Sequence, residues 1–400
     1  MLFKGCSTSN EDKNKLNFDI IDVERQTLEY ADNSKRFYEV SRDFSKQYAH
    51  IYSARLNTFR NILSPLASKK WSKKCKLVKT HFVHETDTVV LEDELQRIKL
   101  SGDCINVNEV VTGVVVAVLG SEDEDGVFSV IDVCWPGCML QKPLPKLEND
   151  SYLVLMSGLN LALQSTEHLF ALNLFLEWIS GFCGTSNYQE EISKVVRVII
   201  AGGIFSSHSD ERTLNESDVI AAAPHVDSIC AALSSVTPLD LMPGCKDPTG
   251  IMLPQKPFHY CLFPKAVEYN TFNRVSNPYE CDIGGLTCLG TAGEPIKDIM
   301  RYSKLEDCLE IMKKTLLWRH IAPTCPDTVP CAPCLDTDPF TMYNCPAIYF
   351  SGNGKEFATD LFIGAEGQKV RLVSVPDFCE TRTVALVNLK NLECYSMVFT

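Results

Sequence analysis

Four short segments combine glycine with residue types that could carry metal chemistry. They are residues 156–160, 201–206, 242–247 and 350–355, and each follows a predicted strand. Two closely spaced divalent cations at such positions would need carboxylate oxygens and imidazole nitrogens as ligands. These segments instead offer glycine, asparagine, serine, cysteine and lysine, and Asp247 alone is a plausible ligand type. The pattern predicts a scaffold that lacks a metal site, so we expect binding rather than catalysis.

A layered α/β domain is the element pattern that would position these segments. Strands are predicted at 152–156, 194–201 and 236–242, with helices at 165–180 and 224–234. Further short strands are expected at 347–351, 370–375, 384–389 and 394–399. Because ligand loops in such sheets lie at the carboxyl ends of the strands, we expect the four segments to meet there.

The region before residue 151 shows a different pattern. Residues 1–36 are polar and aperiodic, so we expect a flexible tail. Apolar residues at helical spacing predict an amphipathic helix from 41 to 63, ended by Ser64-Pro65. Residues 86–136 predict a small β-barrel or a fragment of a β-sandwich, with strands at 107–119 and 126–133 joined by an acidic turn.

Charge and composition narrow the function classes. The formal net charge of −13 argues against a stand-alone nucleic-acid binder, which usually presents a basic surface. Eighteen cysteines without a secretory signal indicate reduced thiols in a cytosolic or nuclear protein. No apolar stretch reaches the length of a membrane span, so we expect no membrane partner.

The cysteines at 325, 331, 334 and 345 are the best candidate for a separate metal site. They include one Cys-x-x-Cys pair, which is a spacing that zinc sites use. A zinc ribbon would need a second close pair, and the sequence has none there. We therefore interpret these residues as reduced thiols in a proline-rich segment, with structural zinc as the open alternative.

Nine segments in fixed order carry a family resemblance. They are residues 91–100, 111–113, 141–143, 253–257, 276–279, 289–293, 319–324, 337–340 and 375–378. With these segments the chain resembles the small, regulatory B-type subunits of eukaryotic DNA polymerase delta over residues 40–400. The resemblance implies an α/β fold with added β structure, in which an OB barrel packs on an inactivated calcineurin-like phosphodiesterase domain. The expected division is a tail at 1–36, a helix and OB-like domain at 37–140, and the phosphodiesterase-like domain at 141–400.

The same resemblance identifies the vestigial ligand positions. Residues that correspond to metal ligands of active relatives are Gly158, Asn160, Gly203, Ser206, Cys245, Lys246, Asp247, Asn353 and Lys355. Lysines at two of these positions would oppose cation binding electrostatically. The resemblance therefore implies no catalytic residue, no metal and no cofactor.

Partners also follow from the resemblance. It implies a noncatalytic nuclear subunit that holds the cysteine-rich C-terminal tail of the polymerase delta catalytic subunit and the third subunit. Contact with the sliding clamp is then indirect, and DNA is reached through the complex. Two alternatives stay open, a residual metal-dependent phosphodiesterase and a single-stranded DNA binding OB module.

One departure from the family pattern affects the barrel. The segment between residues 71 and 91 is shorter than the corresponding segment of the family. The first barrel strand is therefore expected to be absent or replaced by residues 73–90. The expectation is an incomplete or rearranged OB barrel with an exposed edge strand. A gap in the sequence itself is the alternative explanation.

Overall fold

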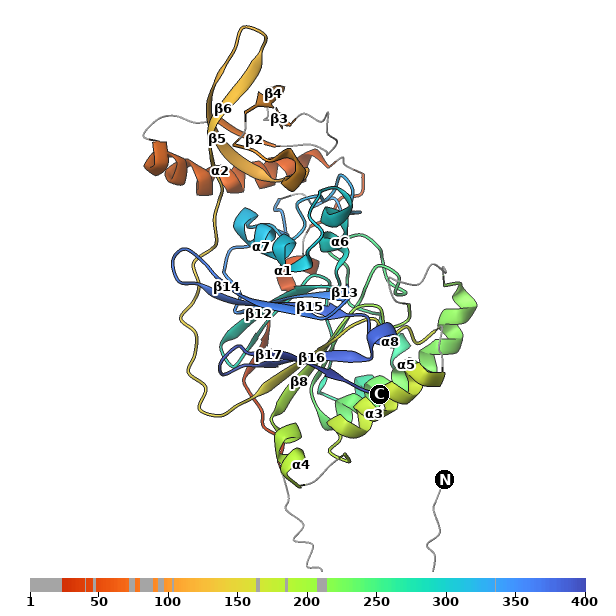
Figure 1. Ribbon diagram of the computed structural model, residues 1–400. Coiled ribbons are helices and arrows are strands. Elements are labelled where there is room, and N and C mark those ends of the chain that lie inside the picture. Colours follow the sequence, from red (N-terminus) through yellow and green to blue (C-terminus); the bar gives the residue numbers. More distant parts are fainter. Residues whose placement is uncertain are drawn as a thin grey trace, which may run out of the picture.

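The computed structural model describes residues 24–39, 41–45, 48–71, 76–79, 89–92, 97–102, 104–162, 166–183, 186–206, 214–334 and 336–400. These residues form a small barrel that sits at one end of a larger layered α/β body (Figure 1).

The barrel is closed, which corrects the expectation of an incomplete barrel with an exposed edge. The alternative, a first strand replaced by residues 73–90, agrees with the strand found at Lys76–Lys79. Its strands, in barrel order, are β2 (Lys76–Lys79), β3 (Val90–Glu92), β4 (Arg97–Ser101), β6 (Val127–Cys134) and β5 (Val115–Glu122). Strand β2 pairs with both β3 and β5, so a strand of four residues is enough to remove the open edge. The first part of the long strand predicted at 107–119 is instead a short 3₁₀ helix, η1 (Val107–Glu109).

Helix α2 (Ala49–Trp71) covers the outside of the barrel and runs through Pro65, so the predicted end at Ser64-Pro65 is wrong. Its buried residues Phe59, Leu63 and Ala67 recur every four positions and pack against the barrel. A proline inside a helix costs about 3 kcal/mol, and burial of this apolar face on both sides of the proline offsets that cost. The β5–β6 hairpin and its acidic turn are confirmed, and the hairpin projects away from the body (Figure 1).

The α/β body contains two six-stranded sheets. In sheet order, the first has β10 (Phe272–Arg274), β9 (Leu239–Met242), β8 (Val195–Ala201), β7 (Tyr152–Met156), β16 (Thr383–Asn388) and β17 (Cys394–Val398). The second has β1 (Tyr30–Asp32), β11 (Tyr279–Ile283), β12 (Leu286–Thr291), β13 (Ile348–Gly354), β15 (Lys369–Pro376) and β14 (Ala358–Ile363). Strands β7 to β10 are parallel, as are β12, β13 and β15.

The sheets face each other, and helices cover their outer faces (Figure 1). Side chains such as Leu155, Ile199 and Phe350 form the core between the sheets. Helices α3 (Thr166–Ile179) and α5 (Glu216–Val236) pack on the first sheet, and α6 (Glu294–Arg301) and α7 (Cys308–Trp318) on the second. The shorter helices are α1 (Lys35–Tyr38), α4 (Ser186–Ser193), α8 (Phe378–Thr381), η2 (Tyr260–Leu262) and η3 (Ala266–Glu268). The predicted α/β domain is therefore a four-layer α/β/β/α sandwich.

Helix α5 is longer than the sequence predicted. It begins at Glu216 rather than at Pro224, because Asn215 and Asp218 form a reciprocal capping box at its start. Within the described part of the chain it is the one helix long and apolar enough to cross a membrane by length and composition. Its residues Val226 and Leu233 are fully buried against the first sheet, which explains the apolar face as a core surface.

The N-terminal segment from residue 24 is ordered, so the expected tail is wrong for residues 24–36; residues 1–23 lie outside the described residues. Strand β1 pairs with β11 at the edge of the second sheet, and Arg25 donates hydrogen bonds to the carbonyl oxygens of Ile179, Ile192 and Val195. Polarity alone suggested a tail, but backbone pairing and a few side-chain contacts hold this segment.

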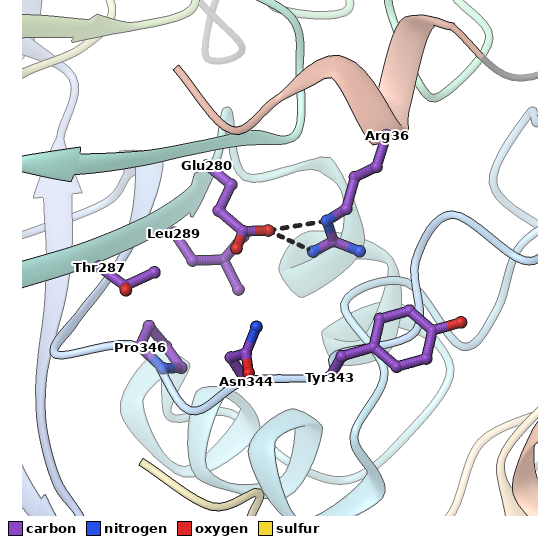
Figure 2. Close-up of a pocket in the computed structure, with 7 residues that line it drawn as sticks. All are labelled: Arg36, Glu280, Thr287, Leu289, Tyr343, Asn344 and Pro346. Carbon is purple, nitrogen blue, oxygen red and sulfur yellow. Dashed lines mark hydrogen bonds and ion pairs between the residues drawn. The ribbon is translucent and has the colours of Figure 1, made fainter. Parts of the chain in front are cut away.

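Arg36 fixes the end of this segment (Figure 2). Its guanidinium forms an ion pair with Glu280 at 2.7 Å and donates to the carbonyl oxygens of Pro339 and Thr341, both at 2.9 Å. The cavity beside this pair holds only about 60 Å³, so we interpret Arg36 as a structural residue and not as part of a ligand site.

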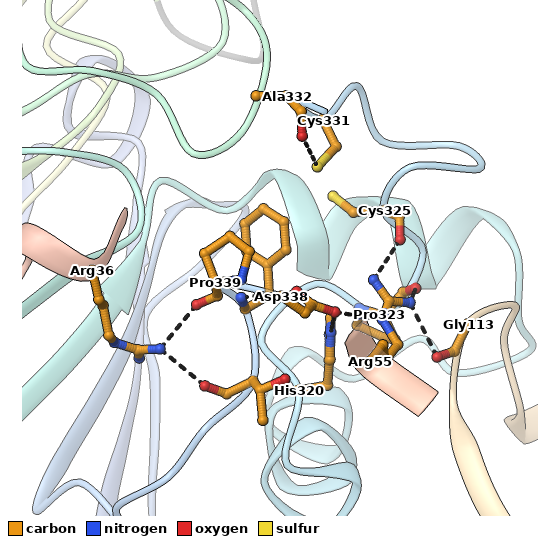
Figure 3. A network of polar contacts seen from close by, with 12 residues as sticks. Arg36, Arg55, Gly113, His320, Pro323, Cys325, Cys331, Ala332, Asp338 and Pro339 are labelled. Atoms are coloured by element: carbon orange, nitrogen blue, oxygen red, sulfur yellow. Dashed lines mark hydrogen bonds and ion pairs between the residues drawn. The ribbon is translucent and has the colours of Figure 1, made fainter. Parts of the chain in front are cut away.

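Arg55 of helix α2 joins the barrel side to the α/β body (Figure 3). Its side chain is 1 % exposed and forms an ion pair with Asp338 at 2.5 Å. The same guanidinium donates to the carbonyl oxygens of Gly113, Pro323 and Cys325. Asp338 also contacts Nε2 of His320 at 2.8 Å.

Candidate functional site

The loops at the carboxyl ends of β7, β8 and β9 meet at one end of the first sheet. The N–H of Gly158 donates to the Gly202 carbonyl at 3.0 Å, and the N–H of Asn160 donates to the Gly203 carbonyl at 3.0 Å. The N–H of Gly202 donates to the Met242 carbonyl at 3.0 Å. The convergence predicted for the four segments is confirmed for these three loops.

The fourth segment reaches the same place from the second sheet. Nδ2 of Asn353, a residue near the end of β13, donates to the carbonyl oxygens of Ala201 at 3.0 Å and Ala292 at 2.8 Å. Its backbone N–H donates to Oγ of Ser157 at 2.8 Å. Asn353 therefore ties the strand ends of both sheets together at a position where the resemblance implied a lost metal ligand.

Asp247, the one surviving ligand type, is used as an acceptor for backbone groups. Oδ2 of the buried carboxylate accepts from the N–H groups of Gly203 at 2.9 Å and Gly244 at 2.8 Å, and Oδ1 accepts from Phe205 at 2.8 Å. Burial raises the pKa of Asp247 to about 6, against the backbone N–H groups that lower it. The carboxylate closes the loops after β8 and β9 onto each other.

The space for metal ligands is also missing. Gly203 has φ of +70°, and a Cβ atom there would collide with Oδ1 of Asn353 and lie 2.9 Å from Cα of Gly158. A Cβ atom on Gly158 would collide with the carboxylate of Asp377. At these two positions, where the resemblance implied lost metal ligands, the contact between the loops leaves room only for glycine. These residues do not fit a divalent metal pair.

The remaining predicted positions lie around this closed cluster. Ser206 is buried, whereas Cys245 and Lys246 are half-buried and Lys355 is exposed. The N–H of Cys245 donates to Oε1 of Glu294 at 2.8 Å, and burial raises the pKa of the Cys245 thiol to about 12. A protonated thiol is a poor metal ligand, which adds to the misfit.

Three side chains that complete the cluster, Gln255, Asn277 and Glu294, were not among the predicted site residues. Asn277 donates through Nδ2 to Oε1 of Gln255 at 2.6 Å and to Oε2 of Glu294 at 3.1 Å. Oδ1 of Asn277 accepts from the N–H of Ala292 at 3.2 Å. Gln255 and Asn277 lie in segments that carried the family resemblance, but neither segment follows one of the four strands, so no local pattern placed them here.

A cavity of about 420 Å³ lies beside the cluster, between helix α6 and strand β13. Its lining includes Lys297, Glu306, Asp307 and Lys355. Burial lowers the pKa of Lys297, although nearby Asp377 and Glu294 oppose the shift. The lining mixes both charge signs, so it does not define one ligand class.

The zinc alternative is not supported by the described residues. Cys345 lies against Cys138, with 3.5 Å between the two Sγ atoms, and not against the other three cysteines of the predicted group. Across the described ranges, no three or more His, Cys, Asp or Glu side chains are grouped so that they could hold a metal ion.

Replacing Asp247 by Asn tests its role as an acceptor. One acceptor oxygen becomes an NH₂ group that faces a backbone N–H, so we expect the free energy of unfolding at pH 7 to fall by about 2–3 kcal/mol. Chemical denaturation of both proteins measures this loss. An unchanged stability would contradict the role.

The pH dependence of the same pair of proteins gives a second expected result. The folded pKa of about 6 lies above the ordinary value of 3.8 for an aspartate, so the wild type holds its full contribution from this group below about pH 4. The part of the stability that comes from this raised pKa is lost as the pH rises through 6, and the advantage that remains at pH 7 comes from the hydrogen bonds that the carboxylate accepts. We therefore expect the stability advantage of the wild type over Asp247→Asn to shrink between pH 4 and pH 7.

Two family comparisons cover most of this chain. The family of the B subunits of DNA polymerases alpha and epsilon matches residues 153–359, which lie in the α/β body. The family described as DNA polymerase delta subunit OB-fold domain matches residues 76–133, which form the barrel.

Individual relatives match nearly the whole chain. DNA polymerase delta subunit 2 of Drosophila melanogaster is 37% identical over 94% of this chain and 98% of its own length. The DNA polymerase delta small subunit of Oryza sativa subsp. japonica is 35% identical over 94% of this chain and 99% of its own. The DNA polymerase delta small subunit of Saccharomyces cerevisiae is 30% identical over 88% of this chain and 89% of its own length.

Proposed function

Because the chain belongs to the family of small subunits of DNA polymerase delta, we propose that it is a noncatalytic accessory subunit of that polymerase in DNA replication and repair synthesis. It holds the cysteine-rich C-terminal tail of the catalytic subunit and also binds the third subunit. Contact with the sliding clamp is then indirect, and DNA is reached through the complex. Since the polymerase copies chromosomal DNA, the proposed place of action is the nucleus.

The observation that carries the noncatalytic part of this proposal is the closed cluster of strand-end loops. The Asp247 carboxylate already accepts hydrogen bonds from backbone N–H groups. At Gly158 and Gly203 the neighbouring atoms leave no room for a side chain. We propose that the α/β/β/α sandwich is a phosphodiesterase-like domain that has lost its metal site. The alternative of a residual metal-dependent phosphodiesterase would need ligands that this cluster does not provide.

The accessory role is supported by the way the two parts of the chain are joined. Arg55 and its buried partners connect the barrel side firmly to the α/β body, as a rigid platform for other subunits requires. The net charge of −13 favours partners with basic surfaces. The alternative of an independent single-stranded DNA binding module has less support, because the projecting hairpin ends in exposed Glu122, Asp123, Glu124 and Asp125.

Co-expression with the C-terminal tail of a polymerase delta catalytic subunit tests the proposal. We expect the two chains to co-elute in size exclusion, with metal found only when the tail is present. A catalytic subunit without its tail is the matched control and should elute separately. Failure to co-elute, together with metal bound by this chain alone, would favour the enzyme alternative.

A further inference from the structure

Cys138 and Cys345 form a close thiol pair that the accessory function does not use. Their Sγ atoms lie 3.5 Å apart although 207 positions separate the residues in the sequence. Cys138 lies on the segment that connects the barrel to the α/β body, and Cys345 precedes strand β13. A disulfide between them would therefore be a long-range crosslink.

The backbone around both sulfur atoms is held in place. The N–H of Cys345 donates to the Leu140 carbonyl at 3.1 Å, and Nε2 of Gln141 donates to the Pro346 carbonyl at 3.1 Å. Nη2 of Arg319 donates to the Cys138 carbonyl at 3.1 Å. These contacts keep the two segments side by side, so the sulfur atoms stay within reach of each other.

The two thiols differ in exposure and acidity. Cys138 is half-buried, whereas Cys345 is 3 % exposed. The contact with the Cys345 thiol lowers the pKa of Cys138, assisted by the Met139 N–H and by Arg319, while burial opposes the shift. The same contact and burial raise the pKa of Cys345. Cys138 is thus the more nucleophilic thiol, and Cys345 is placed as the resolving thiol.

Two other close thiol pairs among the described residues do not combine a half-buried thiol with a buried one. Cys281 and Cys288 face each other across β11 and β12, and both are fully buried. Cys325 and Cys331 are likewise buried, and burial raises the pKa of Cys325 well above its usual value. Neither pair presents a partly exposed thiol to an oxidant.

We propose that Cys138 and Cys345 are a site of reversible oxidation by hydrogen peroxide, which closes a disulfide between the interdomain segment and the α/β body. The Cys138 thiolate attacks one peroxide oxygen, forming the sulfenic acid and releasing hydroxide. The Cys345 thiol then attacks the sulfenic sulfur and water leaves. In total, two thiols lose two hydrogens and one peroxide becomes two waters. A dithiol reductant reverses the reaction.

Peptide mapping of the full chain after treatment with hydrogen peroxide tests this site. We expect a Cys138–Cys345 linked peptide, with a mass loss of about 2 Da that dithiothreitol restores. The buried pair Cys281–Cys288 should remain reduced in the folded protein. Absence of the linked peptide, or reaction at exposed Cys104 and Cys261 before the pair, would overturn the proposal.

Two matched variants separate the roles of the thiols. Cys345→Ser should leave Cys138 as a sulfenic acid that dimedone traps, whereas Cys138→Ser should leave Cys345 unreacted. Thermal unfolding provides a readout that does not depend on mapping. Peroxide should raise the melting temperature of the wild type, because the crosslink restricts the unfolded chain, and should leave both variants unchanged. Equal trapping in the two variants would also contradict the assignment.

Discussion

Replacing Arg55 by Met is expected to lower the free energy of unfolding by about 3–5 kcal/mol. The substitution leaves the buried Asp338 carboxylate without its main partner and removes the donor from three carbonyl oxygens. Although burial alone would raise it, Arg55 and His320 hold the pKa of Asp338 well below its usual value. That depressed pKa shows how strongly the ionised carboxylate depends on these neighbours.

Chemical denaturation is the measurement for Arg55→Met, and Arg60→Met is its matched control. Arg60 lies on the same helix and donates to Oδ1 of Asn57 on the exposed side, so its replacement should cost less than about 1 kcal/mol. Proteolysis of the segment between barrel and body should also become faster in Arg55→Met. Equal stability of the two variants would show that Arg55 does not join the domains.

Replacing Gly203 by Asp places a carboxylate at a proposed vestigial ligand position and is expected to destabilise the protein without creating a metal site. The side chain would collide with Asn353 and meet Cα of Gly158 at 2.9 Å, at a φ of +70°. Strain and overpacking together should cost roughly 2–5 kcal/mol. Denaturation measures the loss, and titration with Mn²⁺ should give no binding.

Gly126→Asp is the matched control for Gly203→Asp. Gly126 has a φ of +74°, but nothing lies within 4 Å of an added Cβ atom. Comparison of the two variants therefore isolates the contribution of close packing from that of the backbone angle. If Gly203→Asp were as stable as Gly126→Asp and bound Mn²⁺ stoichiometrically, the loops would be open, and the proposal of a lost metal site would be wrong.

The sequence predicted the meeting of the loops but not what their side chains do. Strand ends could be placed because β7, β8 and β9 are buried on both faces and appear as continuous apolar runs. The role of Asp247 could not be predicted, because its partners are backbone N–H groups that have no sequence signature. Gln255 and Asn277 come from loops distant in sequence, so their contacts depend on the folded arrangement.

The errors in the predicted elements have two physical causes. Pro65 lies within α2 and Pro224 within α5, because tertiary packing of the apolar faces outweighs the local cost of proline. The four-residue strand β2 is too short for a clear alternating pattern, yet it closes the barrel. Strand β1 has only three residues and depends on β11, so local periodicity could not identify it.

The ordered N-terminal segment also sets a sequence of events during synthesis. The ribosome makes Tyr30 well before its hydrogen-bond partner Tyr279, which lies 249 positions later. The ion pair of Arg55 likewise cannot form until Asp338, 283 positions downstream, has been made. The barrel can close from residues 76–134, but strand β1 must stay undocked until the second sheet has emerged. Docking of the N-terminal segment, and of Arg55 on helix α2, to the α/β body is therefore a late step of co-translational folding, whereas α2 can pack on the barrel earlier.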